Sequence, residues 1–183
     1  MNSPHHLECA AASGVAIIAM SNMLANNGFE QIIPTSQTVN LQGTIVLHFA
    51  MYLLGALLPD IDNEKSWVGR IVHVPFRHRT WTHALYIPIV LIMLSQQFTI
   101  LLPLALGYIN HLFCDSISNA GICWFYPFPG YIRYDNGAFV KRGHKLKLYR
   151  TGSEEERAVT IGIIAISILV TLAMVYLDKM HTL

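Results

Sequence analysis

Long apolar runs separated by polar stretches form the main pattern of this chain. The runs cover residues 7–25, 41–58, 82–94, 98–117 and 158–177. A helix that is apolar on every side lies either in a large core or in a membrane. The last run is long enough to cross a bilayer, which takes about 20 apolar residues. The pattern therefore predicts an all-α fold, a polytopic bundle of about five transmembrane helices.

The composition supports a membrane protein. Hydrophobic residues make up 53% of the 183 residues and charged residues only 13%, against about 25% charged in a soluble domain. Mean hydropathy is +0.42. A chain of this length is expected to form one domain, residues 1–183. The three cysteines show no metal-ribbon spacing, and we expect unpaired thiols in a reducing compartment.

The basic residues predict the orientation. Eleven of the twelve Lys and Arg residues lie in the polar segments 59–81 and 118–157. With five helices, both segments fall on the same side as the N-terminus, and the positive-inside rule makes that side cytoplasmic. Residues 1–6 contain no Lys or Arg, so we expect the first run to be a membrane helix and not a signal peptide. The prediction is a multi-pass protein of the bacterial inner membrane.

Histidines and acids gather on the same predicted side. Every predicted helix has such a residue at its cytoplasmic end, and the candidate metal ligands are His6, Asp60, Asp62, His78, His83, His111 and Asp115. His111 and Asp115 are four residues apart, which places them on one helix face. Imidazole and carboxylate together suit zinc, manganese or iron(II). The predicted site is therefore a divalent metal centre at the cytoplasmic face.

Each of these motifs also has a simpler explanation. Asp60 and Asp62 follow Pro59 and could be solvated acids at a helix end. Residues 77–79 could be positive-inside residues at the lipid headgroups, and His111 could pair with Asp115 alone. The run 154–156 suits a helix start, where carboxylates are favoured by the dipole. Because several motifs converge on one predicted side, a shared functional site explains them better than a separate local cause for each motif.

Five segments, in order, resemble a known family. They are LLPDID, HRTWTH, INHLFCD, AGICWFYPF and YRTGSEEE, within about residues 5–160. Together they resemble the YdjM-like family of LexA-regulated, membrane-bound, metal-dependent hydrolases. That family is distantly similar to zinc-dependent phospholipase C and P1-type nucleases.

The resemblance implies a ligand set. It consists of His6, Asp60, His78 or His83, His111 and Asp115. Asn119 and Gly121 occupy the region where the soluble enzymes have a further His, so we expect one or two ions, zinc first and manganese or iron as alternatives.

We expect a metal-dependent hydrolase that cleaves a phosphoester of a lipid or lipid-like substrate. A metal-activated water would attack phosphorus, with His78 and Arg79 at the substrate and Asp62 or Glu156 accepting the proton. The expected partner is membrane lipid; no nucleic acid is expected, and protein partners are not predicted. The alternative is a non-enzymatic membrane module that binds metal or docks a partner. His83 is preferred over His78 as a metal ligand because it stands at a predicted helix start.

Overall fold

A computed structural model shows the arrangement of these segments. It describes residues 3–26, 41–72, 74, 78–119, 121–128, 132–135, 138–141, 146, 148–150 and 152–181. The five long helices are α1 (Ser3–Asn26), α2 (Leu41–Leu57), α4 (Tyr86–Ser95), α5 (Leu101–Ser116) and α6 (Glu154–His181). Each falls on one of the predicted apolar runs, so the helical character of these runs is confirmed, while five membrane spans stay a prediction.

The polar segments contain shorter elements. Segment 59–81 and its borders form the 3-10 helix η1 (Leu58–Asp62), the helix α3 (Trp67–Ile71) and the 3-10 helix η2 (Trp81–His83). In the second polar segment, β1 (Ile132–Asp135) pairs antiparallel with β2 (Ala138–Lys141). The prediction of helices alone was therefore incomplete by one hairpin. Its two strands have four residues each, too short to stand out from a loop in the sequence.

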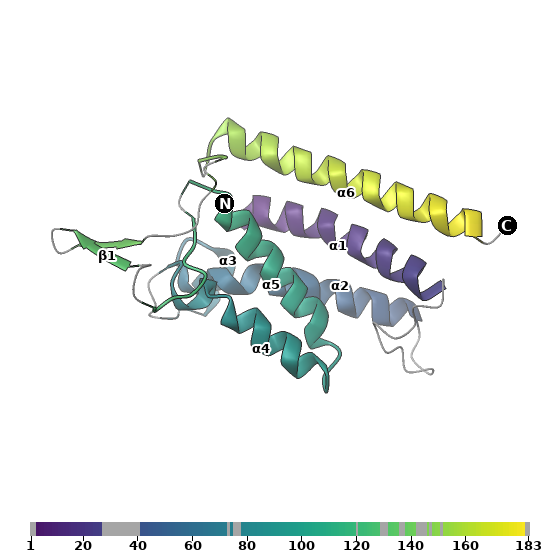
Figure 1. Ribbon diagram of the computed structural model, residues 1–183, viewed down its shortest axis with the longest axis horizontal. Coiled ribbons are helices and arrows are strands. Elements are labelled where there is room, and N and C mark those ends of the chain that lie inside the picture. The colour runs from purple at the N-terminus through teal and green to yellow at the C-terminus, as the bar shows by residue number, and fades with distance from the viewer. Residues whose placement is uncertain are drawn as a thin grey trace.

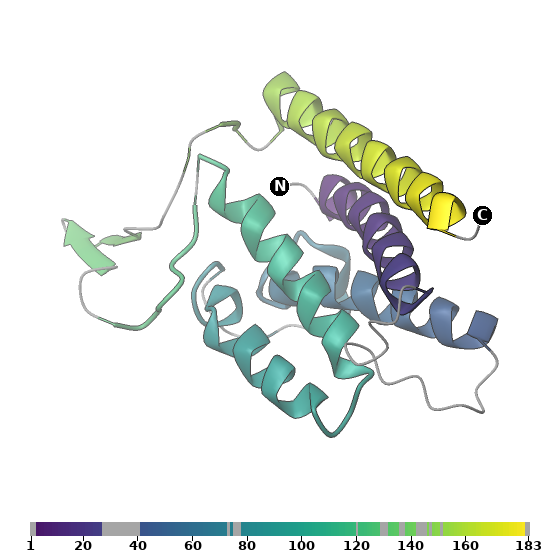
Figure 2. The same ribbon diagram turned by 45° about the vertical axis from the view of Figure 1, so that its right-hand side comes forward.

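The long helices pack in an order that differs from their order in the chain. α6 lies on α1, α1 on α2, α2 on α5, and α5 on α4. In Figure 1, α6, α1 and α2 follow one another from top to bottom, α5 crosses in front of α2, and α4 lies lowest. Figure 2, turned by 45°, shows the same succession, with the β-hairpin standing away from the helices. The chain thus brings the end of α2 and the end of α5 together at one end of the bundle.

Two glycines allow α2 and α5 to touch backbone to backbone. A Cβ atom on Gly55 would lie 2.0 Å from the carbonyl oxygen of Leu104, and one on Gly107 would lie 1.9 Å from that of Tyr52. Small residues at helix contacts permit such close approach within membranes. The contact holds α5 one turn before His111, so it determines where the site residues of α5 lie against α2.

The start of α6 follows the predicted capping pattern. The Ser153 hydroxyl accepts a hydrogen bond from Glu156 N at 3.4 Å, and the Glu156 carboxylate accepts one from Gly152 N at 2.6 Å. These bonds satisfy backbone donors at a helix start. The helix begins at Glu154, four residues before the predicted apolar run, and ends at His181.

The cysteines are free and buried, as predicted. Cys9 of α1 and Cys114 of α5 share an apolar cluster with Ile117 and Tyr149. This cluster joins the first part of α1 to the last turn of α5.

In the part of the chain that the structure describes, two helices are long and apolar enough to cross a membrane. Their windows are Ile45–Asp62, with mean hydropathy 1.5, and Glu154–Leu177, with mean hydropathy 2.6. Two shorter apolar segments are Leu7–Met20 and Tyr86–Ser95. Only 11% of the α6 window is buried, so this helix exposes apolar side chains along most of its length. Such a surface is suited to lipid and not to water. The predicted loop 26–40 lies, apart from Asn26, outside the described residues.

Candidate metal centre

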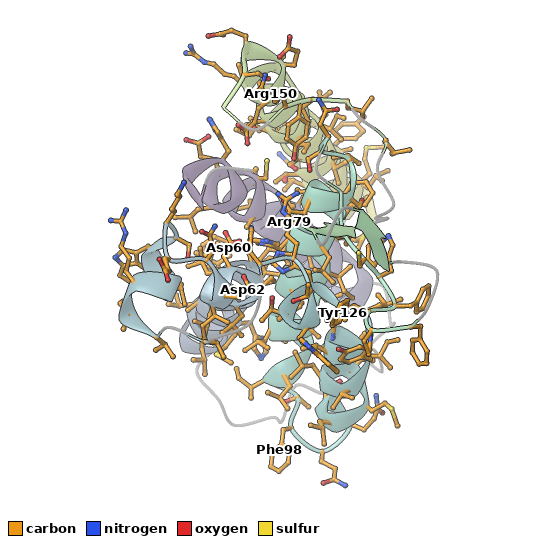
Figure 3. The ribbon with its side chains drawn as sticks, turned by 90° about the vertical axis from the view of Figure 1, so that its left-hand side faces the viewer. Asp60, Asp62, Arg79, Phe98, Tyr126 and Arg150 are labelled. Carbon is orange, nitrogen blue, oxygen red and sulfur yellow. The ribbon has the colours of Figure 1, made fainter. Side chains whose placement is uncertain are left out.

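A buried group of polar side chains occupies the end of the bundle where α2 and α5 end. We call it the Asp–His cluster, and its members are Asp60, Asp62, His78, Arg79, His83, His111 and Asp115. Figure 3 looks onto this end, with Asp60, Asp62 and Arg79 near its centre. Three separate parts of the chain contribute: η1, the segment 78–83, and α5.

The acids of η1 enter the bundle because α2 changes its geometry at its end. Pro59 stands in the first turn of η1, and both Asp60 and Asp62 are only 5% exposed. Pro is well tolerated in a first helical turn, where its missing N–H has no partner to lose. The two carboxylates are thus buried polar groups and not the solvated acids of a helix end.

Asp62 accepts hydrogen bonds from the segment that follows it. His78 Nδ1 lies 2.7 Å from one carboxylate oxygen, and the other accepts from Arg79 N at 3.1 Å and from the Thr82 hydroxyl at 2.5 Å. Arg79 has a positive φ of 63°, a conformation that is uncommon for a non-glycine residue. Asp62 therefore shapes the turn that presents His78 and His83.

The Arg79 side chain reaches behind the cluster to Asp115. Its guanidinium donates to Asp115 Oδ1 at 2.8 Å, and also to the Ser118 hydroxyl and the Gly121 carbonyl, each at 3.2 Å. A charge-assisted bond of this kind fixes the carboxylate rotamer. Asp115 Oδ2 is left facing the histidines, 3.4 Å from His83 Nε2.

The hydrogen bonds determine which ring nitrogen of each histidine carries the proton. His111 Nδ1 lies 2.7 Å from the Ala56 carbonyl, and His78 Nδ1 contacts the Asp62 carboxylate, so both nitrogens must donate. The Thr82 hydroxyl gives its only proton to Asp62 and therefore accepts from His83 Nδ1 at 2.9 Å. In the neutral rings, all three Nε2 atoms then carry lone pairs.

These Nε2 atoms face the remaining carboxylate oxygens. His111 Nε2 lies 3.8 Å from Asp60 Oδ1 and 3.9 Å from Asp115 Oδ2, while His83 Nε2 lies 3.4 Å from Asp115 Oδ2. Ligand atoms around a tetrahedral zinc ion are about 3.3 Å apart, since each lies about 2.0–2.1 Å from the ion. Within the described chain, His83 Nε2 is buried and makes no hydrogen bond. The arrangement fits a metal ion, to which this nitrogen would bind as a ligand.

Among the described residues, two groups of three could hold an ion. The first is Asp60, His83 and His111, all buried; the second is Asp62, His78 and His83, with donor atoms within 4.8 Å of one another in each. Asp115 adjoins the first group through its Oδ2 atom.

Charge and burial both favour a cation in the cluster. Three buried carboxylates and one guanidinium leave two negative charges when the histidines are neutral, and burying unbalanced charge is costly. Burial also lowers the pKa of His83 to about 4, which keeps its ring neutral at physiological pH and able to bind metal. His78 is the most exposed member, at 35%, so it marks the opening of the cluster.

Other predicted site residues lie apart from this grouping or outside the description. Glu156 is fully buried at the start of α6, where it accepts from Gly152 N. It belongs to neither group of potential ligands. His6 lies in the first turns of α1, and its side chain is outside the described part of the structure.

Sequence reasoning missed several supporting groups. Thr82 orients His83, the Tyr108 hydroxyl donates to the Thr82 carbonyl, and Ser118 receives Arg79. Tyr108 stands three residues before His111, which places both on one face of α5. That spacing was the available signal, whereas the partners of Thr82 and Ser118 depend on how the loops fold.

The exposed apolar helices and the buried cluster together define a helical membrane protein with a group of Asp and His side chains that could hold a metal ion. The chain belongs to the YdjM inner membrane protein family, whose sequence model matches residues 1–181.

Three curated proteins illustrate this relationship. "Uncharacterized protein YvsG" of Bacillus subtilis (strain 168) is 32% identical over 130 residues, which cover 64% of this chain and 74% of that protein. "Inner membrane protein YdjM" of Escherichia coli (strain K12) and that of Shigella flexneri are each 29% identical over 94 residues. Those 94 residues cover 41% of this chain and 46% of either protein, less than half its length. No solved structure matches the chain.

Proposed function

We propose that this protein is a membrane-embedded, metal-dependent hydrolase that cleaves a phosphoester of a lipid or lipid-like substrate. The observation that carries the proposal is the convergence of proton-free Nε2 atoms and carboxylate oxygens in a buried, negatively charged cluster. Asp60, His83, His111 and Asp115 hold one divalent ion in this proposal, with zinc the first choice and manganese or iron the alternatives. When bound, such an ion activates water and neutralises charge on a phosphoryl group.

Asp62 is assigned an orienting role rather than a metal bond. Its two oxygens already accept from His78, Arg79 and Thr82. Carboxylates that bind the far nitrogen of a histidine orient the ring and raise its basicity. This use of Asp62 favours one ion over two, although the group of Asp62, His78 and His83 supports a second ion as the alternative.

His78 is the proposed general acid or base. It stands at the opening of the cluster, its Nδ1 is held by Asp62, and its Nε2 lies 4.0 Å from Asp60 Oδ1. A histidine paired with a carboxylate can accept a proton from water and pass it to a leaving group. Arg79 acts behind Asp115 and stabilises that carboxylate in its inward position.

The proposed topology has five spans with the cluster at the cytoplasmic face, and His6 at the start of α1 as a further ligand. The lipid substrate would reach His78 from the bilayer. α4 has 10 residues and α5 has 16, about 15 and 24 Å of helix at 1.5 Å per residue. Both ends of this hairpin lie on the side of the cluster, since His83 precedes α4 and His111 and Asp115 lie near the end of α5.

Hydrolysis of lipid phosphoesters by the purified protein tests the proposal. The protein is reconstituted in vesicles with phosphatidic acid, phosphatidylglycerol or an undecaprenyl phosphate ester, and released phosphate or alcohol is measured with each metal. We expect turnover that His78→Ala abolishes while metal content is retained. His48→Ala, on α2 outside the cluster, is the matched control and should stay active. Bound metal with no hydrolysis of any of these lipids would support the non-enzymatic metal-binding module instead.

A further inference from the structure

A short helix beside the cluster presents apolar side chains outward. In α3, Trp67 and Ile71 are each 66% exposed and lie one turn apart on one face. Lys65 and Arg70 are exposed beside them. Neighbouring indole, aliphatic and cationic groups on one short element are unusual for a surface that meets only water.

The exposure is built into the local structure. Ser66 caps α3 by accepting from Gly69 N at 2.9 Å, and its own hydroxyl donates to the Asp60 carbonyl at 2.7 Å. Gly69 packs so closely that a Cβ there would lie 2.1 Å from the Asn63 carbonyl oxygen. These contacts bind one face of α3 to η1, so Trp67 and Ile71 are held outward.

The position of α3 indicates what covers this face. The helix begins five residues after Asp62, where the apolar window of α2 ends, and it lies at the end of α2 that carries the cluster (Figure 1). Phe125 and Phe128 are also exposed at this end, beside the contact of Trp81 with Tyr126. Aromatic side chains concentrate where a membrane protein passes through the headgroup layer.

We propose that α3 is an interfacial anchor that binds anionic lipid. Trp67 and Ile71 enter the boundary between headgroups and acyl chains, and Lys65 and Arg70 bind lipid phosphates. Because Ser66 links α3 to the backbone of Asp60, the anchor holds the Asp–His cluster at headgroup depth. The proposal rests on the membrane location of the protein and needs neither metal nor hydrolysis.

Depth-dependent fluorescence quenching tests the anchor. The chain has three tryptophans, so Trp81→Phe with Trp124→Phe leaves Trp67 as the only indole. In phosphatidylcholine vesicles with added phosphatidylglycerol, we expect strong quenching by lipids brominated near the headgroup and weaker quenching by lipids brominated near the midplane. Aqueous acrylamide should quench Trp67 much less than it quenches free tryptophan.

Charge variants test the lipid preference. We expect phosphatidylglycerol to increase the quenching of Trp67 by brominated lipid. The double variant Lys65→Gln with Arg70→Gln should lose this increase, whereas Lys179→Gln, near the far end of α6, should keep it. Trp67 that is quenched by acrylamide and not by brominated lipid would overturn the proposal. Lipid quenching that disappears as the protein-to-lipid ratio rises would also overturn it, because a second copy of the chain would then cover this face.

A second reporter keeps the test decisive if the tryptophan variant misfolds. Ile71→Cys carries a spin label, and the three native cysteines are at most 1% exposed, so they should remain unlabelled. Greater relaxation by membrane-soluble oxygen than by a water-soluble nickel chelate is expected. The opposite order would contradict the anchor.

Discussion

At the scale of single residues, hydrogen bonds around the histidines decide what the cluster can bind. Asp62, the Ala56 carbonyl and Thr82 each engage an Nδ1 atom, and the three Nε2 atoms are left with lone pairs. The sequence supplied the members of the cluster, because acids and histidines at the ends of apolar runs are costly without a partner. It could not supply their roles, since these depend on the turn at Arg79.

Because Asp62 orients other groups and Asp115 binds the metal, removing each carboxylate should lower the metal affinity by a different amount. Asp62→Ala should weaken metal binding about 10–100-fold, the usual effect of removing an outer partner of a metal site, because Asp62 binds Thr82, which in turn binds the ligand His83. Excess metal should restore occupancy. Asp115→Ala should prevent stable binding, because it removes a ligand oxygen. Competition with a chelator of known affinity measures both.

The exposed acid Glu64, two residues after Asp62, provides the control for these variants. Glu64→Ala should bind metal as the wild type does. Equal losses for Asp62→Ala and Asp115→Ala would contradict the division and would place Asp62 among the ligands.

At the scale of elements, the crossing of α2 and α5 places the two halves of the cluster. Gly55 and Gly107 permit backbone contact, and the Ala56 carbonyl then meets His111. The five long helices could be predicted because long apolar segments of a membrane protein rarely form any structure other than a helix. The β-hairpin could not, and neither could α3, because elements of four or five residues carry little periodicity.

The crossing predicts that a single methyl group disturbs both stability and metal binding. Gly107→Ala would put a Cβ atom 1.9 Å from a backbone oxygen, so the helices must separate. We expect a loss of about 1–3 kcal/mol in the free energy of unfolding, as for an overpacked core, together with weaker metal binding. Thermal unfolding in detergent and metal titration measure the two effects.

Gly162 on α6 is the matched position for this test. A Cβ atom there meets nothing within 4 Å, and Ala favours a helix over Gly by about 1 kcal/mol. Gly162→Ala should therefore be neutral or slightly stabilising. If Gly107→Ala proved equally harmless, α2 and α5 would not touch as the structure shows.

At the scale of the whole molecule, the distribution of basic residues predicts one orientation in the membrane. Eleven of the twelve Lys and Arg residues lie in the two polar segments, 59–81 and 118–157, which the positive-inside rule predicts to be cytoplasmic. Sequence alone is enough for this prediction, because the asymmetry depends on residue counts and not on packing. The order in which the helices pack against one another needed the structure, because it depends on where α2 and α5 cross.

Reporter fusions test the orientation. Alkaline phosphatase is active only outside the cytoplasm, so fusions after residues 34 and 183 should be active, and fusions after residues 66 and 146 should be inactive. The inverse pattern would place the cluster on the outer face of the membrane. If the fusion after residue 146 were active and the other three behaved as expected, either α4 or α5 would not cross the membrane.

The metal content of the purified protein tests the central claim most directly. Protein purified in detergent without added chelator should contain about one equivalent of zinc, manganese or iron per chain by mass spectrometry. His111→Ala and His83→Ala should contain almost none, while His48→Ala should match the wild type. A folded wild-type protein that contains no metal, and binds none when metal is supplied, would contradict the account.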